Sequence, residues 1–150
     1  GFTYGHNAVM QFYRPIDKEK AYGARKYWHE ALNDPGACQM IHLKNLVLSR
    51  DYFSRVPDQS IVTTKGNRYE YQTATRGNGY AFIYTYTGDT IKVNLSKIPG
   101  GKIKSLWYNP RNGKYHKIKT FINNRKICEF DPPGEKRNGN DWVLVLDWKE

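Results

Sequence analysis

The spacing of apolar residues changes near residue 55, and this change limits the folds open to the chain. Before it, Trp28, Ala31 and Leu32 follow the i, i+3, i+4 rhythm of an amphipathic helix. After it, apolar residues recur at every second position, as a β-strand with one buried face requires. We therefore predict a mainly β protein, an antiparallel β-sandwich preceded by a short helical segment. The predicted domains are residues 1–56, mostly helical, and residues 57–150, the sandwich.

A second helix is expected to begin at Pro35. Asp34 is a residue type that caps helix N-termini, and proline is tolerated next because its missing N–H would have no partner there. The helix should continue to about Arg50. Its predicted apolar face consists of Ala37, Met40, Ile41, Leu43, Val47 and Leu48. Because neither helix can bury its face alone, we expect Trp28, Met40 and Val47 to pack on the sandwich.

Seven segments after residue 58 have strand-like composition between Gly, Pro and Asn clusters. They are Ile61–Thr64, Arg68–Thr75, Gly79–Tyr86, Thr90–Leu95, Lys102–Tyr108, Lys114–Ile122 and Trp142–Trp148. The link Thr87–Asp89 is short enough to form a hairpin between the third and fourth segments. The run Trp142–Leu146 is apolar at successive positions, which predicts a central strand covered on both faces.

Aromatic residues supply the first set of candidate ligand contacts. Alternation places Tyr80, Phe82, Tyr84 and Tyr86 on one face of a strand, either as core or as a stacking platform for sugars. Trp107 and Tyr108 are neighbours, so one of them should face outwards. Trp148 is a third candidate.

A basic block supplies the second set. The chain carries a formal net charge of +10, and ten Lys and Arg residues lie between Lys92 and Lys126 with no Asp or Glu. This block is either solvated surface or a site for an acidic polymer such as a uronate-bearing glycan. Nucleic acid is a competing anion, but no RNP, KH or zinc-finger signature accompanies the block. The lysines expected to share one outward face are Lys102, Lys104, Lys117 and Lys119.

Residue patterns typical of catalysis or metal binding are missing from the sequence. The four histidines form no HExxH pair, and Cys38 and Cys128 are far apart, so no metal site and no cofactor are predicted. One disulfide and two separate thiols both remain open. No run approaches the ~18 apolar residues of a membrane span, and the first 20 residues do not resemble a signal peptide.

Motifs in both parts of the chain resemble one family. Three C-terminal motifs resemble the "putative collagen-binding domain" that ends many bacterial apiosidase-like (DUF4038) glycoside hydrolases: Leu106–Gly113, Phe130–Gly134 and Asp141–Asp147. Four upstream motifs resemble the last strand-and-helix unit of the catalytic barrel in the same proteins: Tyr4–Asn7, Trp28–Leu32, Pro35–Met40 and Arg55–Asp58.

The resemblance implies a (β/α)₈ catalytic barrel, whose active site lies at the C-terminal ends of its strands. The acid/base and nucleophile are expected on the fourth and seventh strands, upstream of Gly1. The chain itself is therefore expected to be non-catalytic, although its parent would be a glycoside hydrolase. In an intact parent, Tyr4 and His6 would line the active-site rim. The resemblance also implies a secreted, periplasmic or cell-surface location in a bacterium.

Three hypotheses for the function follow. The first is a non-catalytic accessory domain that supports the parent catalytic barrel or binds polysaccharide, with an acidic plant polysaccharide as one candidate partner. The second is a collagen-binding or other protein-adhesion module. The third is an independent nucleic-acid-binding protein, for which charge is the single supporting observation.

Overall fold

The computed structural model of this protein describes residues 28–64 and 66–149. The described part of the chain begins with two helices, α1 (Trp28–Ala31) and α2 (Pro35–Leu48). Asp34 occupies the N-cap position of α2 in an extended conformation, although its side chain makes no capping hydrogen bond. The predicted start of this helix at Pro35 is confirmed. Tyr4 and His6 lie outside the described residues.

Two antiparallel sheets follow, which confirms the predicted sandwich. The larger sheet has the order β1-β2-β3-β8-β5-β6 and the smaller one pairs β4 with β7. The strands of the larger sheet are β1 (Val56–Pro57), β2 (Thr73–Gly77), β3 (Tyr80–Thr85), β5 (Lys102–Asn109), β6 (Lys114–Ile122) and β8 (Trp142–Lys149). The smaller sheet consists of β4 (Ile91–Asn94) and β7 (Ile127–Phe130). Short 3₁₀ helices connect them: η3 (Gln59–Ile61), η4 (Arg68–Glu70) and η5 (Leu95–Lys97).

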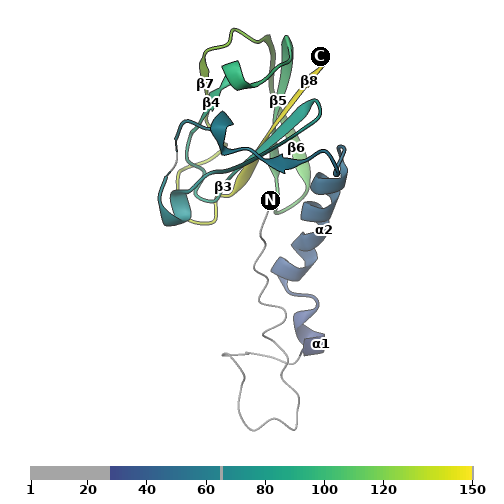
Figure 1. Ribbon diagram of the computed structural model, residues 1–150. Helices are drawn as coiled ribbons and strands as arrows, with labels where there is room; N and C mark the ends of the chain where they lie inside the picture. The colour runs from purple at the N-terminus through teal and green to yellow at the C-terminus, as the bar shows by residue number, and fades with distance from the viewer. Residues whose placement is uncertain (1–27, 65, 150) are drawn as a thin grey trace.

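Both faces of the larger sheet are covered. Figure 1 shows α2 on one side of it and the smaller sheet on the other. The core between the two sheets includes Ile83, Trp107 and Leu144. A second cluster lies on the other face of the larger sheet, where Phe82 and Val145 pack with Leu46 of α2. β8 lies between β3 and β5, so its unbroken apolar run is buried on both faces. This confirms the prediction of a central strand.

The expected hairpin at Thr87–Asp89 is wrong. β3 pairs with β2 and β8, whereas β4 belongs to the smaller sheet, so the link crosses from one sheet to the other. Gly88 makes this crossing possible, because its φ is +68° and a Cβ there would lie 2.5 Å from the Asn140 side chain. In place of β4, the apolar strand β8 pairs with β3, although the two strands are far apart in the sequence.

Two further strand predictions need correction. The segment Ile61–Thr64 forms the end of η3 and one isolated bridge between Val62 and Val93. The first half of Arg68–Thr75 forms η4, and strand β2 begins at Thr73. The sequence also missed β1 and β7, which contain two and four residues and are too short to display a clear period of two.

The apolar face predicted for α2 is rotated in the structure. Leu46, missing from that face, is 1% exposed, whereas Ile41 and Leu48 are 49% and 59% exposed. Arg50 holds the C-terminal end of this segment, because its Nε and Nη2 donate to the two Asp147 carboxylate oxygens at 3.0 and 2.8 Å. Apolar residues occur on both sides of α2, so periodicity alone could not select the side that meets the sheet.

Candidate functional site

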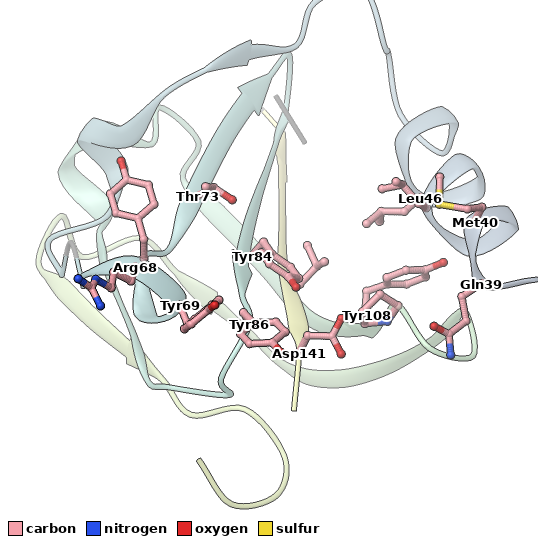
Figure 2. Close-up of a pocket in the computed structure, with 14 residues that line it drawn as sticks. Gln39, Met40, Leu46, Arg68, Tyr69, Thr73, Tyr84, Tyr86, Tyr108 and Asp141 are labelled. Carbon is pink, nitrogen blue, oxygen red and sulfur yellow. The ribbon is translucent and has the colours of Figure 1, made fainter. Parts of the chain in front are cut away.

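A groove of about 410 Å³ separates α2 from η4 above the larger sheet (Figure 2). Five tyrosines contribute to its lining, so we call it the tyrosine groove. Its lining residues are Gln39, Met40, Leu43, Leu46, Arg68, Tyr69, Tyr71, Thr73, Tyr84, Tyr86, Tyr108, Pro110, Asp141 and Val143. The volume falls within the range of about 300–1,000 Å³ that is usual for ligand sites.

The floor of the groove continues the aromatic stripe of β3. Strand alternation points Tyr80, Phe82 and Tyr84 towards α2, with Tyr86 just beyond the strand. The segment after α2 covers the first two rings: Tyr80 Oη donates to the Asp51 carbonyl at 2.8 Å, and the Arg50 guanidinium lies 5.5 Å from the Phe82 ring. The stripe is therefore core at one end and groove lining at the other.

Tyr108 of β5 attaches the helix to this floor. Its Oη donates to the His42 carbonyl of α2 at 2.7 Å, and burial raises the pKa of Tyr108 to about 12, with Tyr115 adding to the effect. Close packing supports the same contact, since a Cβ on Gly113 would lie 2.6 Å from His42 Nδ1. The α2 wall is therefore held at fixed spacing from the sheet.

The opposite wall is the 3₁₀ turn η4. Arg68 begins it with φ +50°, a left-handed conformation that is uncommon outside glycine. Lys136 holds the turn from outside the groove, because its Nζ lies 2.9 Å from Glu70 and 2.8 Å from Asp89. Hydrogen bonds to Asp89 and Glu70 raise the pKa of Lys136. Inside the groove, the rings of Tyr69 and Tyr86 have centroids 5.8 Å apart.

Asp141 is the only acidic residue among the described residues that line the groove. Burial raises the pKa of Asp141, while the positive charge of Arg111, 3.2 Å away, opposes that change. Arg111 is itself fixed, because it donates to the Gly139 carbonyl at 2.9 Å and lies over the Trp142 ring at 5.2 Å. Hydrolysis of a glycosidic bond requires two carboxyl groups, so this arrangement favours binding rather than catalysis.

The three aromatic candidates have different environments. Trp107 is buried between the sheets, where its Nε1 donates to the Asp131 carbonyl at 3.1 Å. Tyr108, on the other face, lines the groove. The expectation that one of this pair faces outwards is wrong, because both faces of the sheet are covered. Trp148 is also buried in the core between the sheets.

The four candidate lysines do not share one face. Lys102 and Lys104 are two residues apart on β5, so they share a face, and they line a second hollow of about 330 Å³ together with Trp148. A β-bulge between Ser105 and Leu106 then places Lys119 opposite Ser105 and Lys117 opposite Leu106. Since Ser105 and Leu106 point to opposite faces, the two lysines do so as well.

Contacts of Lys119 agree with this geometry. Its Nζ lies 5.1 Å from the Phe121 ring and 5.6 Å from the Phe130 ring, on the side of the smaller sheet. Part of the basic block also has structural roles: Lys92 pairs with Glu129 at 2.8 Å, and Arg125 Nη1 donates to the Ile98 carbonyl at 2.8 Å. The prediction that all four lysines share one face is therefore wrong for Lys119, whereas Lys117 lies on the same face as Lys102 and Lys104.

Sequence reasoning missed the groove residues outside β3 and β5. Tyr69 and Tyr71 were assigned to a strand, and Asp141 was treated as part of a family motif. The available signal was composition, since the chain has 12 tyrosines and only 6 phenylalanines. A buried core has no need for that many hydroxyl groups.

Family comparisons divide the chain at the end of the helical segment. Residues 56–147 match the family described as "Putative collagen-binding domain of a collagenase", and residues 1–54 match "Apiosidase-like, catalytic domain". No curated protein matches the chain. The α2 wall of the tyrosine groove thus lies in one matched region, and its floor and η4 wall lie in the other.

Solved structures of glycoside hydrolases resemble the chain closely. One described as "Glycoside hydrolase" has a TM-score of 0.84 and 45% sequence identity, over 98% of this chain and 33% of that chain. A glycoside hydrolase family 5 protein from Bacteroides vulgatus ATCC 8482 has a TM-score of 0.83 and 43% identity, over 97% of this chain and 32% of that chain. The chain therefore spans about a third of the length of each.

Proposed function

We propose a function from the premise that this chain belongs to the "Putative collagen-binding domain of a collagenase" family, joined to the end of an apiosidase-like catalytic domain. The sandwich is a non-catalytic accessory domain whose role is to support the catalytic barrel of a glycoside hydrolase. Helix α2 is the joint between the two parts.

The position of α2 carries this proposal. The helix lies within the region that matches the catalytic domain, yet Leu46 is buried in the core of the sandwich. On its other side, Ile41 and Leu48 are mostly exposed, and Phe53 beyond the helix is 93% exposed. Full burial of an aliphatic side chain contributes about 1.5–3 kcal/mol, so this outer face is suited to a second packing partner. The rest of the barrel is the partner that we propose.

Fragment complementation tests this role. The 45% identical glycoside hydrolase would be produced without the third of its length that this chain matches, then mixed with the chain. We expect activity on an aryl glycoside that the intact relative hydrolyses to return with the wild-type chain. It should fall at least roughly tenfold with Ile41→Asp or Leu48→Asp, since each would place a charge in the interface.

Ile127→Asp is the matched control, because Ile127 is similarly exposed but lies on β7 in the smaller sheet. This variant should restore activity as well as the wild type does. Full activity of the truncated relative without the chain, or equal rescue by all three variants, would contradict the proposed support.

The absence of catalysis in this chain is the second part of the proposal. Among the described residues, six carboxylates are paired with basic side chains: Asp58, Glu70, Asp89, Glu129, Asp141 and Asp147. We place both catalytic carboxylates in the part of the parent that precedes residue 1. The purified chain alone should not hydrolyse aryl glycosides. Measurable turnover that survives Tyr4→Ala and His6→Ala would contradict this placement.

A further inference from the structure

We propose that the tyrosine groove is a binding site for a short neutral oligosaccharide. This role is additional to the support of the barrel and does not depend on it. The argument rests on the chemistry of the walls, on the contacts that hold them, and on the charge inside the groove.

The chemistry of the walls matches a sugar ring. Tyr69 and Tyr71 line the groove and are 68% and 43% exposed. Figure 2 shows Tyr69 beside the half-buried Tyr86. A tyrosine combines an apolar ring with a polar hydroxyl group. A pyranose likewise has an apolar C–H face bordered by hydroxyl groups, so it can stack on the ring and exchange hydrogen bonds with the phenol.

The walls are held by contacts outside the groove. Lys136 fixes η4 through Glu70, Tyr108 fixes α2 through the His42 carbonyl, and Arg111 fixes Asp141. A ligand therefore finds the walls already arranged, and binding does not have to order these segments.

The charge inside the groove favours a neutral ligand. No lysine is among its lining residues, and its two charged side chains, Arg68 and Asp141, have opposite signs. Arg111 further offsets the Asp141 carboxylate. Asp141 can accept hydrogen bonds from sugar hydroxyl groups, and the groove has no cluster of positive charge that would select a uronate carboxylate over a neutral sugar. The groove thus differs from the basic remainder of the surface.

A protein segment would be a poorer fit than a sugar. The outer face of α2 shows the chemistry that this chain uses where protein packing is expected, namely the aliphatic Ile41 and Leu48. The floor and the η4 wall of the groove instead carry phenol hydroxyl groups, which would need partners if a protein segment covered them. Sugar hydroxyl groups and water supply those partners.

Calorimetric titration of the full chain tests the proposal. The probes are neutral oligosaccharides of galactose, xylose, arabinose and glucose, with oligogalacturonate and a collagen-like triple-helical peptide in separate arms. We expect at least one neutral oligosaccharide to bind, with little change between 50 and about 500 mM salt, since no charge on the ligand would be screened. The double variant Tyr69→Ala, Tyr71→Ala should bind it at least roughly tenfold more weakly.

Two further variants keep the result interpretable. Tyr52→Ala removes a comparably exposed tyrosine, 47% exposed, that lies outside the groove, and it should bind like the wild type. The double variant Tyr69→Phe, Tyr71→Phe retains both rings and should bind with intermediate affinity. No binding of any neutral probe, tighter binding of oligogalacturonate or of the collagen-like peptide, or equal binding by the Ala double variant would overturn the proposal.

Discussion

The tyrosine groove and the outer face of helix α2 present different chemistry to their surroundings. The groove takes its phenol groups from the sheet and from the region of η4, whereas the outer face of α2 displays the aliphatic Ile41 and Leu48. Aliphatic side chains can only be stabilised by losing contact with water, so they suit a permanent packing partner. Tyrosines tolerate water at their hydroxyl groups and can exchange one partner for another. This difference in chemistry is the reason why we propose separate roles for the groove and for the outer helix face.

Removing Leu46 should have the largest effect, because it is the buried residue that anchors α2 on the sandwich. We expect Leu46→Ala to lower the free energy of unfolding by about 2–5 kcal/mol. Leu48→Ala, two residues further on the exposed side, should change it by less than about 0.5 kcal/mol. Urea denaturation of both variants measures the difference. Equal losses would mean that both sides of α2 are packed within this chain.

Tyr108→Phe should have an intermediate effect, because it removes the hydrogen bond to the His42 carbonyl. The expected loss is about 1 kcal/mol of unfolding free energy at neutral pH. Since folding raises the pKa of Tyr108 to about 12, the native state holds this proton more tightly than the unfolded state. The wild type should therefore lose stability relative to Tyr108→Phe as the pH rises from about 10 to about 12. Parallel stability profiles of the two proteins across that range would contradict the burial argument.

Lys136→Met should have the smallest effect on stability, because its ion pairs with Glu70 and Asp89 are solvent-exposed. We expect the midpoint of urea denaturation to stay close to that of the wild type, because solvent screens these pairs. If these pairs position η4, the same variant should weaken binding of the neutral oligosaccharide a few-fold in the calorimetric assay. Lys126→Met, a lysine remote from η4 in the sequence, serves as the control. Unchanged binding would show that Tyr69 is held without Lys136.

A fourth test concerns the basic block, which contrasts with the near-neutral groove. Substituting Lys102→Gln and Lys104→Gln should leave binding of the neutral oligosaccharide unchanged, because both lysines line the other hollow. Any binding of oligogalacturonate by the wild-type chain should weaken in this variant and at high salt. Loss of neutral-sugar binding in the lysine variant would remove the distinction between the two hollows.

Local features of the sequence determined most of the elements. The proline after Asp34 set the start of α2, alternation identified β3, and the segment Lys114–Ile122 was predicted with the bounds that β6 has in the structure. The unbroken apolar run in Trp142–Leu146 also identified β8 as the central strand. These successes share one physical cause, since side-chain direction within an element follows from its own backbone period.

Only the tertiary structure decided how the elements meet. It placed β3 and β4 in different sheets, rotated α2 so that Leu46 faces the core, and separated Lys117 from Lys119 by a β-bulge. The tyrosine groove is likewise built from segments far apart in the sequence, α2, η4 and the strands of the larger sheet. The residues that β3 and Leu46 contact lie tens of positions away, and no local period can encode such a choice of partner.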